Sequence, residues 1–174
     1  MSLSVIKTLK YILLLIIFGL STSIGMAIAK AYGNRVDELK EFKNILNIMK
    51  TKIKFTYEPL GEIFRQIAKD NDTEIEKIFG QMANQITYYQ AKDVWENCIQ
   101  DADISIKQED KNILKRLGKL LGQTDVNGQV SEIEVTEEFL SIQIEKAEEE
   151  KKKNQKMCKT LGVVSGLVSC IILF

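Results

Sequence analysis

The hydrophobic positions of this chain follow two different patterns. Residues 11–29 are predominantly apolar, with no charge between Lys10 and Lys30, and residues 161–174 are also uncharged. Between these two stretches, apolar residues recur at steps of three and four, which is the spacing of amphipathic helices with one buried face. The pattern predicts two membrane-spanning segments on either side of a water-soluble helical region.

Both apolar segments are long enough to cross a bilayer. Residues 11–29 reach roughly 28 Å as a helix, close to the thickness of a hydrocarbon core. The second segment reaches roughly 27 Å if it begins at Met157 and Lys159 snorkels toward the headgroups. We therefore predict a short N-terminal tail (1–10), a transmembrane helix (11–29), a middle domain (30–156) and a second transmembrane helix (157–174).

The periodic middle segment predicts an all-α fold with about six helices. Thr73-x-x-Glu76 and Ser105-x-x-Gln108 have the form of capping boxes, and either Thr124 or Asp125 is suited to cap the last helix. The expected helices cover residues 37–55, 59–68, 73–86, 91–102 and 105–121, followed by a last helix from about 125 to the C-terminus. No helix breaker interrupts the last helix, so we expect it to run as a stalk into the second span. The first helix would do the same in reverse, unless Gly33-Asn34 bends it.

Charge and composition argue against nucleic-acid binding, catalysis and metal binding. The 24 basic residues balance the 24 acidic ones, so no global charge attracts nucleic acid. The chain has no histidine, which removes the commonest general base and transition-metal ligand, and its three cysteines form no CxxC pair. We expect no catalytic residue, no metal, no cofactor and no small-molecule substrate.

The distribution of cations predicts the side of the membrane. Four cations follow the first apolar segment (Lys30, Arg35, Lys40 and Lys43), and six lysines lie between residues 146 and 159, before the second. The positive-inside rule then places the middle domain in the cytoplasm. The alternative is a signal peptide cleaved after Ala27-Ile28-Ala29, which would send this basic region to the opposite side.

Small residues form a stripe on each predicted span. One stripe contains Ser21, Gly25 and Ala29, and the other contains Gly162 and Gly166. Such stripes let helices approach closely in lipid, so they are candidates for pairing of the spans within or between chains. The simpler interpretation is that small residues are common in transmembrane helices.

Four stretches resemble the stage III sporulation protein AB family of endospore-forming bacteria. They are EPLGEIFRQIA (58–68), VWENCI (94–99), LGKLLGQTDVNGQ (117–129) and KTLGVVSGL (159–167), in this order between the two spans. The resemblance implies a soluble part similar to the helical F domain of type II secretion platform proteins. It also implies membership in the channel complex between mother cell and forespore, with a secretion-type ATPase and ring-forming proteins as partners.

The resemblance leads to specific expectations for this chain. Asp125 and Gln129 lie in the third stretch and are candidate contacts for the ATPase, although helix capping also explains an aspartate there. Secretion platforms usually carry two such domains in tandem and this chain has one, so we expect a homo-oligomer. The expected location is the mother-cell membrane around the forespore, in contact with membrane lipids.

A non-catalytic membrane scaffold best explains two spans and the lack of any site motif. A membrane enzyme would need polar residues that converge on a pocket, and the sequence contains no such constellation. The main alternative is a membrane-tethered adaptor or sensor unrelated to secretion.

Overall fold

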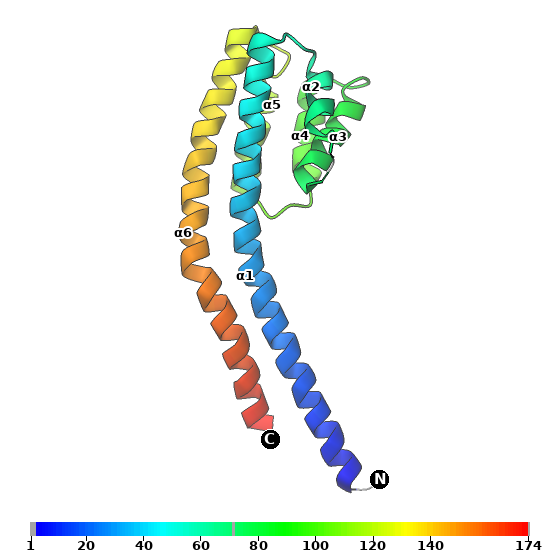
Figure 1. Ribbon diagram of the computed structural model, residues 1–174, viewed down its shortest axis with the longest axis vertical. Coiled ribbons are helices and arrows are strands. Elements are labelled where there is room, and N and C mark those ends of the chain that lie inside the picture. Colours follow the sequence, from blue (N-terminus) through cyan, green and yellow to red (C-terminus); the bar gives the residue numbers. More distant parts are fainter. Residues whose placement is uncertain (1–2, 71, 174) are drawn as a thin grey trace. The chain divides into compact units, whose positions relative to one another are not determined.

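The computed structural model describes residues 3–70 and 72–173, and within this part of the chain all regular secondary structure is α-helical. The six helices are α1 (Leu3–Phe55), α2 (Leu60–Ile67), α3 (Glu74–Gln85), α4 (Ala91–Asp101), α5 (Gln108–Gly118) and α6 (Val126–Leu173) (Figure 1). The predicted all-α class and the six helices are confirmed. Because α1 starts at Leu3, residues 3–10 of the expected tail are already helical.

The chain divides into two compact units. Unit 1 comprises Met1–Asn34 and Ala147–Phe174, and unit 2 comprises Arg35–Lys146. Both α1 and α6 contribute to both units because each helix is continuous. The helix assignment of α1 passes through Gly33 and Asn34 without interruption, as the sequence allowed but did not require.

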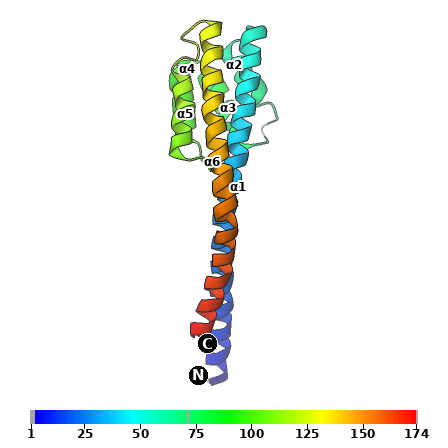
Figure 2. The same cartoon turned by 90° about the vertical axis from the view of Figure 1, so that its left-hand side faces the viewer.

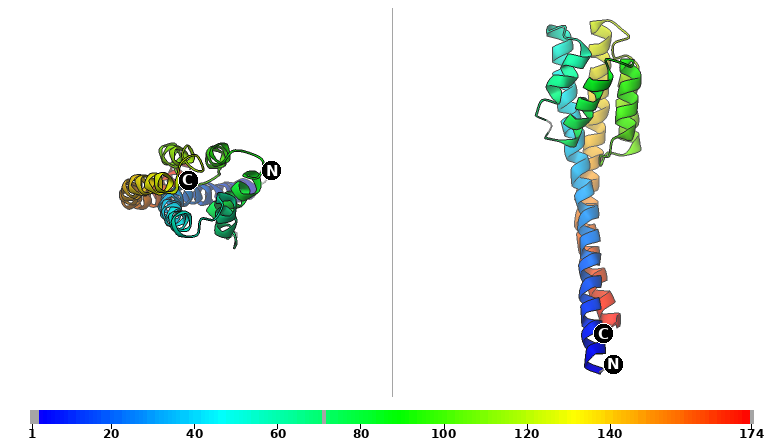
Figure 3. Two further views of the ribbon diagram at one scale, coloured as in Figure 1. Left: turned by 90° about the horizontal axis from the view of Figure 1, so that it is seen from above. Right: turned by 90° about the vertical axis from the view of Figure 1, so that its right-hand side faces the viewer.

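Unit 2 is a helical bundle with one apolar core. In it, α1 and α6 lie side by side, and the short helices pack in the order α2, α3, α4 and α5 (Figures 1 and 3). The apolar stripe predicted on α1 is buried, and it consists of Leu39, Phe42, Leu46, Met49 and Ile53. The facing stripe of α6 contributes Ile133 and Leu140.

An aromatic cluster joins the short helices. Phe64 of α2, Phe79 of α3 and Trp95 of α4 are fully buried, with ring centroids 5.6–6.0 Å apart. The Trp95 indole N–H donates a 2.7 Å hydrogen bond to the carbonyl oxygen of Leu114 on α5. Edge-to-face aromatic pairs and a satisfied indole donor are both stabilising in a core. Trp95 is therefore a core residue.

One of the two predicted capping boxes is present. The Thr73 hydroxyl accepts the N–H of Glu76 at 3.1 Å, and the Glu76 carboxylate accepts the N–H of Thr73. The expectation for Ser105 is wrong, because α5 begins at Gln108 and its start is held by Asp110, which accepts the Lys107 N–H at 2.9 Å. The Ser105 N–H instead donates to the Glu38 carboxylate on α1 at 2.6 Å.

Unit 1 contains the N-terminal part of α1 and the C-terminal part of α6, which run antiparallel side by side (Figures 1 and 2). Among the described residues, one helix, Leu9–Phe55, is long and apolar enough to cross a membrane. This finding is compatible with membrane association at the first predicted span. The second predicted span (157–174) includes Phe174 and the side chains of Ser169, Cys170, Ile172 and Leu173, which lie outside the described part, and it stays a prediction.

Candidate interaction surfaces

The two small-residue stripes meet in unit 1. A methyl group added at Gly25 would lie 2.7 Å from the carbonyl oxygen of Cys158 and 2.9 Å from the Cα of Gly162. The Ser21 hydroxyl donates to the Gly162 carbonyl at 2.9 Å and lies 2.6 Å from the Ser165 hydroxyl. The backbones of α1 and α6 are thus as close here as residues without large side chains permit.

The remaining stripe residues extend this contact between α1 and α6, which we call the seam, in both directions. Gly166 is buried against Phe18, because an added methyl group would lie 2.8 Å from the Phe18 ring. Ala29 has no exposed surface. The structure therefore places all five predicted packing residues in buried or half-buried positions of unit 1, with Gly25 and Gly162 in direct apposition.

The outward surface of unit 1 is apolar. Side chains of both helices that point away from the seam are large and at least one-third exposed, among them Leu15, Leu20, Ile24, Leu161 and Leu167. Exposed apolar surface of this extent is unusual on a water-soluble protein. It suits contact with lipid chains.

Three loops converge at one end of unit 2, and we call this region the loop end (residues 55–60, 86–91 and 119–126). A methyl group added at Gly61 would meet the side chain of Ile86 at 2.9 Å. One added at Gly122 would lie within 3.7 Å of both Leu60 and Ala91. Gly122 has φ +71°, a left-handed conformation that costs glycine little, which explains a glycine in this turn.

The loop end carries four exposed aromatic side chains, in contrast to the buried ring cluster of the core. Tyr57 is 76% exposed and Tyr88 is 81% exposed, and Phe55 and Tyr89 are also mostly exposed. Within the described chain, Tyr57 is the one non-glycine residue with positive φ, at 54°. Exposed tyrosines are enriched in protein–protein interfaces, and strained backbone is concentrated at functional positions. Sequence periodicity did not identify the three tyrosines because they lie in loops, and Phe55 is the last residue of α1.

Asp125 and Gln129, the predicted partner contacts, both lie at the start of α6 beside this loop end. Asp125 caps α6, since its carboxylate accepts the Gly128 N–H at 3.0 Å. The Gln129 side chain accepts the Gly122 N–H and donates to the Thr124 carbonyl, both at 3.1 Å. These hydrogen bonds give both residues a local role in stabilising the turn before α6. Asp125 is also exposed to solvent.

A buried ion pair ties three helices of unit 2 together. The Arg35 guanidinium of α1 donates to both carboxylate oxygens of Asp110 on α5, at 2.9 and 3.1 Å, and its Nη2 lies 3.5 Å from the Gln143 amide oxygen on α6. Both charged side chains are almost fully shielded from solvent. The sequence had marked Arg35 only as one of the cations beside the first span, and no local pattern reveals a partner 75 positions away.

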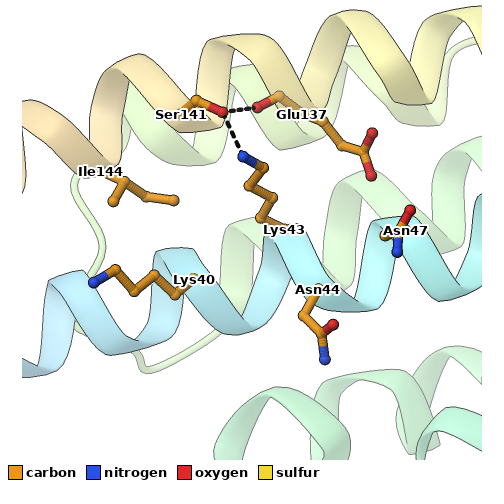
Figure 4. Close-up of a pocket in the computed structure, with 7 residues that line it drawn as sticks. All are labelled: Lys40, Lys43, Asn44, Asn47, Glu137, Ser141 and Ile144. Carbon is orange, nitrogen blue, oxygen red and sulfur yellow. Dashed lines mark hydrogen bonds between the residues drawn. The ribbon is translucent and has the colours of Figure 1, made fainter.

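A polar groove of about 510 Å³ lies between α1 and α6 in unit 2 (Figure 4). Lys40, Lys43, Asn44 and Asn47 line one side, and Glu137, Ser141 and Ile144 line the other. Lys43 donates to the Ser141 hydroxyl at 2.8 Å, so its ammonium group spans the groove (Figure 4). The groove is open and holds no converging set of acid, base and nucleophile.

The other titratable groups also lack catalytic features. Burial raises the pKa of Glu38, although hydrogen bonds from Ser105 and Ile106 oppose the shift. Burial also raises the pKa of the Cys98 thiol, with a smaller contribution from Asp101, which favours an unreactive thiol. Among the described residues, no three His, Cys, Asp or Glu side chains gather as metal ligands would.

The fold and surfaces define a helical protein whose first helix is suited to a membrane. Three comparisons identify its relatives. A family model described as stage III sporulation protein AB matches residues 10–174. The stage III sporulation protein AB of Bacillus subtilis (strain 168) is 27% identical over 157 residues, which cover 88% of this chain and 92% of that protein. A solved structure of stage III sporulation protein AB has a TM-score of 0.63 and 23% identity, covering 68% of this chain and 96% of that chain, and shares the fold.

The chain belongs to the stage III sporulation protein AB family. This confirms the resemblance found in the four sequence stretches and assigns the protein a role in sporulation. The names of these relatives contain no enzymatic activity.

Proposed function

We propose that this protein is a non-catalytic platform of the sporulation channel between mother cell and forespore. Two spans anchor it in the mother-cell membrane around the forespore, with the bundle of unit 2 in the cytoplasm. A secretion-type ATPase docks on the bundle, and ring-forming channel proteins and further copies of the chain complete the assembly.

The continuity of α1 and α6 is the observation that supports this proposal most strongly. Each helix contains core residues of unit 2, such as Phe42 and Leu140, and seam residues of unit 1, such as Gly25 and Gly162. A protein without an active site acts by transmitting binding events. A helix that continues from one unit into the other is a direct route for such transmission.

The loop end is the docking surface that we assign to the ATPase. It combines the exposed tyrosines with the solvent-facing side of Asp125. Aromatic side chains offer large contact area at a low cost in conformational entropy, and they are frequent hot spots. Because Tyr57 and Tyr88 are exposed, their removal should leave the core intact.

Co-purification tests the docking proposal. The full chain, solubilised in detergent from sporulating cells, should retain the secretion-type ATPase, and Tyr57→Ser with Tyr88→Ser should lose it. Ile142→Ser is the matched control, because Ile142 is an exposed apolar residue of α6 outside the loop end. Asp125→Asn separates charge from capping, since asparagine is also a good N-cap.

The outcomes of this experiment distinguish the alternatives. If no ATPase accompanies the wild-type chain under any solubilising condition, the chain is better described as a tethered adaptor or sensor. If the double tyrosine variant retains the ATPase, docking occurs elsewhere on unit 2.

A glycine insertion tests transmission through α6. Three glycines inserted between Glu150 and Lys151 disrupt the helix at a cost of about 1 kcal/mol each, outside the core stripe of unit 2. Membrane localisation and ATPase binding should survive, and sporulation should fail after engulfment. Normal spore yield from the insertion strain would mean that a stiff α6 is not required.

A further inference from the structure

The register of the seam in unit 1 places two lysines of α6 beside the apolar part of α1. Cys158 and Gly162 lie against Gly25, and Gly166 lies against Phe18. Because the helices are antiparallel, Lys159 is level with about Gly25, and Lys156 is level with about residue 28 of α1. Met26, an α1 residue at about the level of Lys159, has an exposed apolar side chain.

This register places the backbone of both lysines level with the uncharged stretch of α1 that precedes Lys30. Lys30, the first cation after the apolar stretch of α1, is about 7 Å further along the helix axis than the level of Gly25. Lys156 and Lys159 are exposed, so the seam does not bury their charges. Each side chain therefore has to extend along the helix surface to bring its charge out of the hydrocarbon region.

The surrounding charges favour an anionic ligand. Five lysines occur between residues 151 and 159, and no Asp or Glu occurs between residue 151 and the C-terminus. Lys152 and Lys153 are exposed one turn before this pair, and Lys30 is exposed on α1. A basic cluster at the end of an apolar helix attracts anionic lipids, and each lysine near the surface contributes.

We infer that Lys156 and Lys159 bind the headgroup phosphate of an anionic phospholipid whose acyl chains lie against the exposed apolar surface of unit 1. The seam fixes the height of the two lysines, and the lipid neutralises a charge that the neighbouring helix cannot pair. This inference rests on the proposed membrane anchoring, which it extends by naming a lipid class and the residues that select it.

Lipid selectivity of the reconstituted full chain provides the test. The wild-type protein is placed in phosphatidylcholine vesicles that contain spin-labelled phosphatidylglycerol or spin-labelled phosphatidylcholine, and the motionally restricted fraction of each label is measured. We expect a preference for phosphatidylglycerol that weakens as salt is raised. Lys156→Gln with Lys159→Gln should reduce this preference by roughly fivefold for each lysine.

Matched variants control for net charge and folding. Lys69→Gln with Lys119→Gln removes two exposed lysines of unit 2 and should leave the preference unchanged. Lys156→Arg with Lys159→Arg retains the charge and should retain the preference. Inorganic phosphate at the concentration of the labelled lipid should not displace the lipid, because the acyl chains contribute to binding.

The possible failures are distinguishable. If the wild-type chain inserts in the vesicles but shows no preference, or if the Lys156 and Lys159 double glutamine variant keeps it, the lipid site is refuted and the membrane anchor stands. If the wild-type chain fails to insert in vesicles of either composition, the proposed anchoring is itself wrong.

Discussion

The buried Arg35–Asp110 pair provides a demanding test of the structure, and Asp110→Asn is the informative substitution. The Asp110 carboxylate accepts hydrogen bonds from Nε and Nη2 of Arg35 and from the Lys107 N–H. Asparagine keeps the size of the side chain but replaces one acceptor oxygen with a donor and removes the negative charge. The guanidinium would then remain in a shielded site without its counter-ion.

The burial of both partners sets the expected loss in the free energy of unfolding. Removing one member of a buried ion pair costs about 3–5 kcal/mol, because the other charge stays desolvated. Glu109 lies 3.7 Å from Arg35 and offers some compensation, but its side chain is half exposed. We therefore expect a loss near the lower limit, about 3 kcal/mol. For a unit of about 110 residues this corresponds to a decrease in Tm of roughly 12 °C.

Intrinsic fluorescence of the full chain in detergent gives the measurement. Trp95 is the single tryptophan, and it lies in the core of unit 2, so its emission reports unfolding of this unit. Glu109→Gln is the control and should cost less than about 1 kcal/mol, as expected for an exposed ion pair. Arg35→Met combined with Asp110→Leu removes both charges and should be less damaging than Asp110→Asn alone.

The result that would refute this reasoning is specific. If Asp110→Asn and Glu109→Gln lower the Tm by equal small amounts, Arg35 and Asp110 do not form a shielded pair in the folded protein. If the double variant loses as much stability as the sum of its two single variants, the two side chains act independently.

Three further predictions concern other contacts. Gly118→Ala should cost about 1–3 kcal/mol, measured by thermal unfolding, because its methyl group would lie 2.6 Å from the Trp95 ring. For Glu38, burial raises the pKa above its ordinary value of 4.5, so ionisation opposes folding at neutral pH and this cost disappears as the pH falls below 4.5. The Tm of Glu38→Gln relative to wild type should therefore be higher at pH 7 than at pH 4, and an opposite trend would contradict the shift. Gly162→Leu with Gly166→Leu should weaken the association of α1 and α6 in unit 1 by on the order of 1 kcal/mol or more, which lowers the yield of cysteine crosslinks between them. The thermal unfolding of unit 2, followed by Trp95 fluorescence, should stay unchanged.

Local sequence patterns were sufficient to predict the helices and much of the core. The three-four spacing of Leu39, Phe42 and Leu46 identified the buried face of α1, and the capping box at Thr73 identified the start of α3. These features depend on residues within one or two helical turns of each other, so periodicity and capping chemistry reveal them.

The features that the sequence did not reveal depend on tertiary proximity. The partners Arg35 and Asp110 lie on helices whose relative rotation is set by packing, and the close approach of Gly118 to Trp95 involves two helices. The start of α5 was misplaced because Ser105 has the chemistry of an N-cap, but its N–H is used by Glu38 of α1. A tertiary hydrogen bond thus decided between two local alternatives.

The pairing of α1 with α6 in unit 2 has a consequence for biosynthesis. Lys43 and Ser141 are hydrogen-bonded although 98 positions separate them, and Lys50 and Glu137 are paired across 87 positions. At synthesis rates of about 5–20 residues per second, the apolar face of α1 waits roughly 5–20 s for its partner helix. The hairpins of α2 with α3 and of α4 with α5 need only short-range contacts and can form earlier. The ribosome therefore completes the bundle only with the last quarter of the chain, and a nascent chain arrested before α6 exposes the stripe that ends at Ile53 to chaperones and proteases.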